Sequence, residues 1–348
     1  MTSSLAFPIG SGLLLSLACG LLTALLIIIM RPLMRRYAMA RPNARSSHRK
    51  PTPQGGGFGV VAVTLALTVV AVAILLGSDA VLALVPVLAA TLLLTVIGAI
   101  DDIFVIQVWP RLFWQAVAAA IVTVLLPANL HIFPQLPLWA ERLLLVLAGI
   151  WFVNLVNFMD GIDWMTVAEF VPVVAALTVF GLLGFLPLHA TLLAFALVGS
   201  MLGFAPFNRP VAKLFLGDIG SLPLGLLLGW LLVQLAGTGN VVAALILPLY
   251  YLADTTITLL RRLAAGEHIM QAHRSHFYQR ACSNGFSVMQ VVIRTFALNV
   301  TLSLLAFATL ATAGTMSLAL LALGAFLVGG QLYIFAKRRG QRDWEPSL

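Results

Sequence analysis

Charged residues are scarce in this sequence, and so is cysteine. Asp, Glu, Lys and Arg make up 9% of the 348 residues and hydrophobic residues 61%, whereas a water-soluble domain carries roughly 25% charged residues. This shortage excludes a protein whose surface faces mainly water. Cys19 lies in an apolar run and Cys282 in a basic segment, which excludes a disulfide framework and a cysteine metal site. Basic and aromatic residues do not interleave, so nucleic acid is not an expected partner.

Long apolar runs take the place of the missing charge. They approach the roughly 20 residues that cross a bilayer as a helix, and they recur along the whole chain. The sequence therefore predicts an all-α polytopic integral membrane protein, with residues 1–348 forming a single membrane-embedded domain. The first run lacks a basic leader and a clear cleavage site, so we expect a retained span rather than a signal peptide. About eleven spans are predicted, near residues 9–30, 57–77, 80–100, 112–128, 141–158, 165–186, 190–207, 222–237, 241–260, 291–312 and 317–336.

The basic residues predict the orientation, because loops rich in Lys and Arg stay in the cytoplasm. An eleven-span arrangement places 19 of the 20 Lys and Arg residues on one side and leaves Arg142 on the other. The N-terminus is then outside and the C-terminus cytoplasmic. The formal net charge of +8 is thus an orientation signal, suited also to anionic lipid head groups or a phosphorylated substrate. The basic segments are 31–50, the loop near Arg111, 209–213, 261–294 and the tail from Lys337.

Acidic residues gather at the cytoplasmic ends of the predicted spans, where acids are costly and usually functional. Asp101 and Asp102 end the third span, Asp160 follows the fifth, and Asp218 lies between the seventh and eighth. Steps of three residues from Asn154 to Asn157 to Asp160 place these side chains on one helix face. We therefore expect them to share one cavity, with Asp163 nearby and Asp254 in the ninth span. Asp79, Glu141 and Glu267 are interpreted as helix caps or solvated charges.

Carboxylates mixed with basic side chains favour a site for Mg²⁺ and a diphosphate, because hard cations prefer carboxylate and phosphate oxygens. Lys50, Lys213, His273 and His276 are the basic members of this expected site. Each group also has an ordinary interpretation. The Asp pair alone could face water, the residues of 31–50 could only set topology, and the two histidines could be solvated loop residues.

The motifs, in their order, resemble the polyprenyl-phosphate N-acetylhexosamine-1-phosphate transferases, a family within glycosyltransferase family 4. The resemblance covers nearly the whole chain. It rests on Lys50–Gly57, Asp101–Asp102, NLVNFMDGID from Asn154 to Asp163, NRPVAKLFLGDIGS from Asn208 to Ser221, and HRSHFYQR from His273 to Arg280.

The resemblance implies roles for individual residues. Asp218 becomes the first choice for a metal ligand, and Asn208 matches an Asn that contacts the nucleotide. The implied catalytic residues are Asp101, Asp102, Asp218, His273 and His276; the implied substrate-binding residues are Lys50, Asn157, Asp160, Asp163, Asn208, Lys213 and Arg274; and the implied metal ligands are Asp218, Asp101 and Asp102.

The sequence departs from the family pattern in three places. Ile103-Phe104-Val105 follows the Asp pair and lacks a third acid, and Trp164-Met165 stands where many members have Gly-Leu, which leaves the sugar open. The last motif reads His-Arg-Ser-His rather than three histidines, which disfavours a peptide-bearing donor.

The function implied is transfer of a sugar 1-phosphate from a UDP-N-acetylhexosamine to undecaprenyl (polyprenyl) phosphate, with release of UMP. The expected cofactor is Mg²⁺, with Mn²⁺ as the alternative. The expected location is the bacterial inner membrane, among membrane lipids, with the site on the cytoplasmic face. The product is expected to start a lipid-linked glycan such as O-antigen. Open points are the donor (GlcNAc, GalNAc, FucNAc or QuiNAc), a one-step or two-step mechanism, and a homodimer. The alternative is a polytopic secondary transporter with acids in the membrane.

Overall fold

The computed structural model describes residues 2–40, 51–268, 273–312 and 314–337, and most of these residues are helical. Two short strands, β1 (Met39–Ala40) and β2 (Thr52–Pro53), pair antiparallel. The helices are α1 (Thr2–Tyr37), α2 (Gly56–Leu76), α3 (Ser78–Phe104), α4 (Val108–Val124), α5 (Leu138–Met159), α6 (Met165–Leu182), α7 (Leu188–Asn208), α8 (Asp218–Gly237), α9 (Val241–Ile246), α10 (Leu249–Ala264), α11 (Phe277–Ser283), α12 (Val288–Ala308) and α13 (Thr315–Ala336), with a 3₁₀ turn at Thr309–Ala311. The all-α polytopic prediction is confirmed.

Nine helices within the described ranges are long and apolar enough to cross a membrane: α1, α2, α3, α5, α6, α7, α8, α12 with its 3₁₀ turn, and α13. Helix α4 is apolar but only 17 residues long. The ninth predicted span consists of two helices, α9 and α10, which meet at Leu247 and Pro248. Pro248 has no N–H to continue the hydrogen bonds of α9, so the helix breaks there. The number of eleven spans and the orientation of the termini stay predictions.

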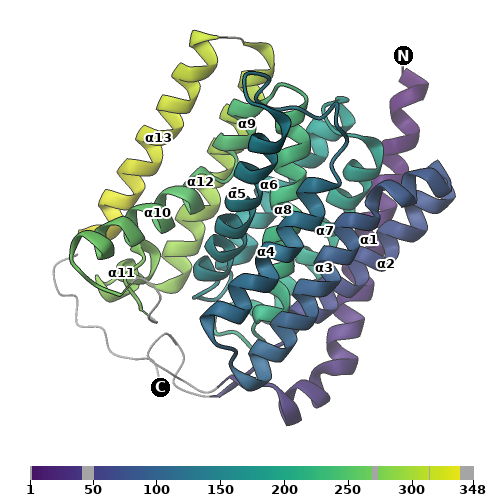
Figure 1. Ribbon diagram of the computed structural model, residues 1–348. Coiled ribbons are helices and arrows are strands. Elements are labelled where there is room, and N and C mark those ends of the chain that lie inside the picture. The colour runs from purple at the N-terminus through teal and green to yellow at the C-terminus, as the bar shows by residue number, and fades with distance from the viewer. Residues whose placement is uncertain (1, 41–50, 269–272, 313, 338–348) are drawn as a thin grey trace.

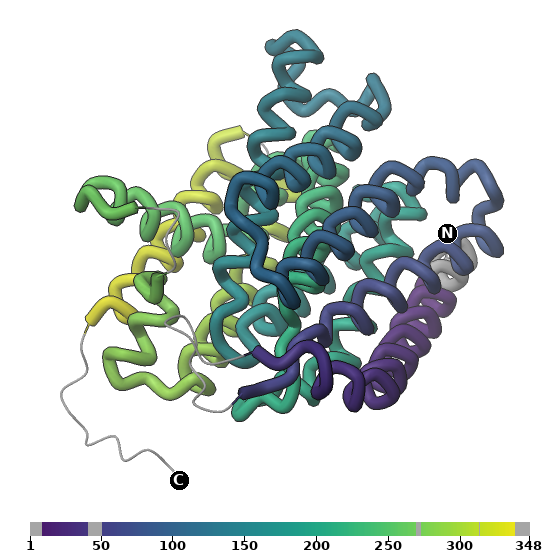
Figure 2. Tube along the Cα trace, turned by 60° about the horizontal axis from the view of Figure 1, so that its bottom comes forward, coloured from purple at the N-terminus to yellow at the C-terminus, as the bar shows by residue number. Residues whose placement is uncertain are grey.

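Helices α7 and α8 form the interior of the bundle. About 72% and 83% of their apolar windows are buried, compared with 22% for α1 and α13. Helices α1 and α13 lie at opposite margins in both Figure 1 and Figure 2. Large apolar side chains of α1, such as Leu14 at 68% exposure, point outward. This pattern is expected when lipid is the solvent, because an apolar side chain gains no hydrophobic free energy by moving from lipid into the protein interior.

Glycines allow the start of α8 to lie against α2 and α3. A side chain on Gly98 of α3 would collide with the backbone of Asp218, and one on Gly57 of α2 would collide with Gly220. Backbones that approach this closely are typical of packed membrane helices with small residues at the contact. The glycines therefore set where the first residues of α8 stand relative to the end of α3.

A buried acid within α6 has a structural explanation. Pro172 interrupts the hydrogen bonds of α6 and frees the carbonyl of Ala168. The side-chain nitrogen of Asn299 on α12 donates to that carbonyl at 3.1 Å and to Glu169 Oε2 at 2.6 Å. Asn299 thus satisfies the carbonyl freed by proline and one oxygen of the neighbouring carboxyl. The contact joins α6 to α12 inside the membrane-spanning part of the bundle.

The end of the bundle where α5 begins is held by Glu141 and Arg142. Glu141 is fully buried and accepts the Phe133 N–H at 2.7 Å. Arg142, which the predicted topology places opposite the other basic residues, donates to the carbonyls of Pro127 and Leu130 at 3.0 and 2.9 Å. Both residues fix the loop before α5. The interpretation of Glu141 as a helix cap or a solvated charge was wrong, because its carboxyl is buried and binds the loop before α5.

Candidate active site

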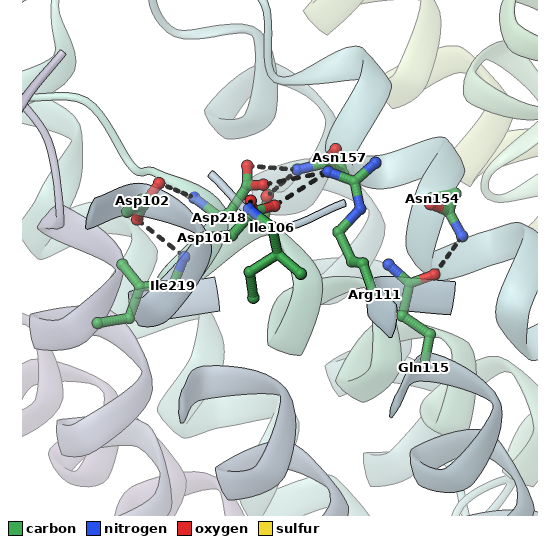
Figure 3. A network of polar contacts seen from close by, with 10 residues as sticks. Asp101, Asp102, Ile106, Arg111, Gln115, Asn154, Asn157, Asp218 and Ile219 are labelled. Atoms are coloured by element: carbon green, nitrogen blue, oxygen red, sulfur yellow. Dashed lines mark hydrogen bonds and ion pairs between the residues drawn. The ribbon is translucent and has the colours of Figure 1, made fainter. Parts of the chain in front are cut away.

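The predicted carboxylates meet at the end of the bundle where α3 and α5 finish and α8 begins. Figure 3 shows Asp101 and Asp102 from α3, Asn157 from α5, Asp218 from α8 and Arg111 from α4 in one network. The sequence separations within this network reach 116 residues. The expectation that separate spans bring these acids together therefore agrees with the geometry.

Asp102 caps the start of α8. Its Oδ1 accepts the N–H of Asp218 at 2.9 Å and its Oδ2 accepts the N–H of Ile219 at 3.1 Å. A carboxylate at this position pairs with free helix amides and with the positive end of the helix dipole. The Asp102 carbonyl also accepts from Gln54 Nε2 at 2.8 Å, which ties in the Gly-rich segment before α2. Asp102 therefore sets the position of Asp218.

Asp101 pairs with a basic residue on α4. Its Oδ1 accepts the Ile106 N–H at 2.6 Å, and its Oδ2 lies 3.0 Å from Arg111 Nη1. The same Arg111 nitrogen lies 3.6 Å from Asp218 Oδ2. Arg111 thus bridges the two carboxylates and offsets part of their mutual repulsion.

Asp218 is more open than Asp101. Its side chain is 28% exposed, compared with 6% for Asp101. Asn157 Nδ2 donates to Asp218 Oδ1 at 2.7 Å and to Ser221 Oγ at 2.8 Å, which fixes the carboxylate while Oδ2 faces Arg111. Asp218 is therefore held in place on one side and remains reachable for a ligand.

Asp160 follows α5 and accepts a hydrogen bond from the Thr166 hydroxyl. Burial raises the pKa of Asp160 to about 7; the Thr166 bond lowers it, and the charges of Asp218 and Asp163 raise it. A carboxyl with such a pKa gains its proton as the pH falls below neutrality and loses it above. It can therefore exchange a proton under physiological conditions.

Asp163 and Asn208 join two loops of the site. Asp163 Oδ2 accepts the Ala212 N–H at 2.9 Å. Asn208 Oδ1 accepts the Trp164 N–H at 2.8 Å, and its Nδ2 donates to the Leu214 carbonyl at 3.0 Å. These contacts hold the segment before α8 against the turn after α5. They give both residues a positioning role, and their contact with a nucleotide stays a prediction.

The histidine motif lies beside the end of α5. His276 is buried, its ring stacks on His273 with centroids 4.9 Å apart, and it lies 6.1 Å from the ring of Phe158. The Tyr278 hydroxyl donates to the Phe158 carbonyl at 2.9 Å. Arg274 and Lys213 are exposed at this end of the bundle, and Lys50 lies outside the described residues.

Comparison with known proteins shows which family the chain resembles. The model of glycosyl transferase family 4 matches residues 84–236, which run from α3 to α8 and carry all the acids of the network. Decaprenyl-phosphate N-acetylglucosaminephosphotransferase of Mycobacterium leprae is 28% identical over 74% of this chain and 73% of its own length. The probable undecaprenyl-phosphate N-acetylglucosaminyl 1-phosphate transferase of Bacillus subtilis is 26% identical over 77% of each chain.

The chain is similar to glycosyl transferase family 4 over residues 84–236, and these two relatives carry the names of polyprenyl-phosphate sugar-phosphate transferases. The resemblance of its motifs is thereby confirmed. A phospho-N-acetylmuramoyl-pentapeptide-transferase, from Gluconacetobacter diazotrophicus, is 32% identical over 53% of this chain and 57% of that protein.

Sequence reasoning missed Arg111 as a site residue. Arg111 was counted only as a basic loop residue, although it follows Asp101 by ten positions. The signal available was a lone basic residue near the membrane surface, directly after an acidic pair. A positive charge there can neutralise the acids, and it can also bind phosphate.

Asp218 is the carboxylate of the network that could share a metal ion with substrate. The described part of the chain contains no group of three or more His, Cys, Asp or Glu side chains placed to hold a metal. Asp102 uses both oxygens on backbone amides, and Asp101 uses both on Ile106 and Arg111. Mg²⁺ is usually held by one or two carboxylates together with substrate phosphates. Asp218 fits that pattern, and metal ligation by Asp218, Asp101 and Asp102 stays a prediction.

Proposed function

We propose that the protein transfers an N-acetylhexosamine 1-phosphate from a UDP-sugar to a polyprenyl phosphate and releases UMP. The observation that carries the proposal is the network of Asp101, Asp102, Asp218, Asn157 and Arg111 at the ends of four helices. Such a network handles phosphate groups of two substrates at the membrane surface. The names of the Mycobacterium and Bacillus relatives support a polyprenyl phosphate acceptor and favour UDP-N-acetylglucosamine as the first donor to test.

An apolar cavity supports a lipid acceptor. It has a volume of about 290 Å³, lies between α4, α5, α8, α9 and α10, and is lined almost entirely by apolar groups, among them Phe152, Leu226 and Trp230. Apolar pockets with a few polar groups at one end suit amphiphilic ligands. The first isoprene units of a polyprenyl chain have the right character for this cavity.

Helix α4 connects the cavity to the carboxylate network. Arg111, Gln115 and Ala119 follow one another at four-residue steps, so they lie along one face of the helix. Arg111 reaches Asp101, Gln115 bonds Asn154 at 2.5 Å (Figure 3), and Ala119 lines the cavity. A lipid phosphate placed at Arg111 would therefore leave its chain in the apolar cavity.

The reaction follows from this placement. An oxygen of the lipid phosphate attacks the β-phosphorus of the donor, the bond between that phosphorus and the bridging oxygen breaks, and the oxygen leaves with UMP. Arg111 offsets the negative charge of the two phosphate groups, while Asp102 and Asn157 keep Asp218 in place. A Mg²⁺ ion held by Asp218 would supply additional positive charge to the diphosphate.

We place this site at the cytoplasmic face of a bacterial inner membrane, where the nucleotide donor is soluble. The support is the asymmetric distribution of basic residues, since 19 of the 20 Lys and Arg residues fall on that side in the eleven-span arrangement. The product would start a lipid-linked glycan, with O-antigen as one example.

The test is incubation of the purified full-length protein with polyprenyl phosphate, Mg²⁺ and a panel of UDP-sugars. We expect one UDP-N-acetylhexosamine to yield UMP and a lipid-linked sugar in equal amounts, and no UMP when the lipid or Mg²⁺ is omitted. The panel contains UDP-GlcNAc, UDP-GalNAc and their 6-deoxy relatives. Uptake of a solute by proteoliposomes without any product from the panel would instead support the transporter alternative.

A further inference from the structure

We propose that Asp254 is a positioning residue for His276. In this proposal, Asp254 turns the Nδ1 side of the imidazole toward α10 and leaves Nε2 on the opposite side of the ring, toward the site. The inference rests on the proposed function and adds to it a residue that neither the motifs nor the carboxylate network includes.

Asp254 is fully buried on α10 and caps the start of α11. Its Oδ1 accepts the N–H of Phe277 at 2.9 Å, and its Oδ2 accepts the N–H of Tyr278 at 3.1 Å. The Tyr250 hydroxyl donates to Oδ2 at 3.2 Å. The Thr258 hydroxyl also donates to Oδ1, at 3.4 Å. These four donors fix the carboxylate in one orientation, so its position relative to His276, the residue before Phe277, is also fixed.

The imidazole of His276 faces this carboxylate. Nδ1 lies 3.4 Å from Asp254 Oδ1, and it has no hydrogen-bond partner among the described residues. The separation exceeds that of a well-formed N–H···O bond, so the carboxylate acts on the ring mainly through its charge. A negative charge at this position favours a proton on Nδ1. The neutral ring then carries its lone pair on Nε2.

Stacked rings prevent His276 from turning away. The ring is 2% exposed and lies between His273, with centroids 4.9 Å apart, and Tyr278, with centroids 5.9 Å apart. A flip of the imidazole would have to open this stack. The carboxylate and the stack together therefore select both the orientation of the ring and the nitrogen that carries the proton.

Helix α11 is docked on the part of α5 that serves the carboxylate network. The Tyr278 hydroxyl reaches the Phe158 carbonyl at 2.9 Å, next to Asn157. Gly161 leaves room for this hydroxyl, because a side chain there would collide with it. A change at Asp254 would therefore alter the structure next to the residues of the carboxylate network. Nε2 of His276 is the group through which Asp254 acts, by accepting or donating a proton at substrate phosphate.

A double-mutant cycle separates this role from simple capping of α11. The variants are Asp254→Asn, His276→Ala and the pair together, each in the full chain. We expect Asp254→Asn alone to lower kcat about 10- to 100-fold, as for groups that orient a functional histidine, with donor KM within about 2-fold. In the His276→Ala background the same change should cost nothing further. An equal loss in both backgrounds would overturn the proposal. Tyr250→Phe, which removes one donor and keeps the carboxylate, is the matched control.

A second measurement does not depend on transfer activity. The protein has six histidines, and ¹⁵N-histidine NMR of the full chain, with His276 assigned through His276→Gln, reports which ring nitrogen carries the proton. We expect the Nδ1–H form of neutral His276 in the wild type. The Nε2–H form would overturn the proposal even if Asp254→Asn does not fold. Absence of UMP formation by the wild type would count against the proposed function and leave this NMR result to stand on its own.

Discussion

Asp218→Asn is expected to lower kcat by roughly 10²- to 10³-fold, the loss seen when one preorganised electrostatic group is removed from an active site. The substitution keeps the shape of the side chain and removes the charge from a carboxylate whose side chain is 28% exposed. Asn157 can still donate to the remaining oxygen, and Asp102 still caps α8 through backbone amides. The helix should therefore form normally, while the negative charge proposed to bind Mg²⁺ is lost.

The measurement is kcat at saturating donor, together with the thermal midpoint in the same detergent. Asp79→Asn is the matched control, because Asp79 is an exposed acid in the first turn of α3. The control should retain wild-type turnover, and both variants should retain the wild-type midpoint within a few degrees. Near-normal turnover by Asp218→Asn would remove this residue from the mechanism.

Arg111→Ala should lower kcat/KM for the polyprenyl phosphate about 100-fold, a loss of about 2.7 kcal/mol in transition-state stabilisation. The guanidinium lies 3.0 Å from Asp101 and 3.6 Å from Asp218, with only 13% of the side chain exposed. Its removal leaves two carboxylates to repel each other and the incoming phosphate. Arg111→Lys should recover part of the loss, because Lys supplies the charge but cannot reach two acids with one planar group.

Initial rates at varied lipid concentration, in mixed micelles of constant composition, measure this effect. Lys337→Ala removes an exposed positive charge at the end of α13 and serves as the control. Equal losses for Arg111→Ala and Lys337→Ala would mean that Arg111 contributes only to the general surface charge. Equal activity of Arg111→Lys and the wild type would mean that the contact of one guanidinium with both Asp101 and Asp218 has no role in the reaction.

The membrane architecture was predictable because each span is encoded locally. An apolar run of sufficient length has one stable form in lipid, a helix whose backbone groups bond within the segment. The grouping of Asp101, Asp102 and Asp218 was predictable for a related reason, since the order of spans places their ends on one side of the membrane. The family motifs indicated which residue types to expect at the site.

The separate roles of these acids were not predictable, because they depend on close approach between helices. Asp102 reaches the amides of α8 only because Gly98 lets the two backbones meet. Nothing in the spacing of the acidic pair indicates that one member caps a helix and the other pairs with Arg111. Asp254 was likewise recognised as an acid in a span, while its contact with α11 joins segments 23 and 24 residues apart across a loop.

Glu169 illustrates a different limit. A carboxyl within a span favours an ion pathway when only the sequence is considered. In the structure it bonds Asn299, which also occupies the carbonyl freed by Pro172. Proline, acid and amide form one structural unit. The amide of Asn299 lies about 130 residues from the acid along the chain, so the sequence alone does not indicate the contact.

The fate of the donor's β-phosphate tests the central proposal most directly. A sugar transfer without phosphate would break the bond between sugar and phosphate and release UDP, whereas the proposed attack on the β-phosphorus releases UMP. Donor labelled in the β-phosphate is incubated with protein, polyprenyl phosphate and Mg²⁺, and the organic and aqueous phases are then counted. We predict that label and sugar enter the organic phase together, and that added UMP returns both to the nucleotide. Label that remains in the aqueous phase as UDP, while the sugar enters the lipid, would contradict the account.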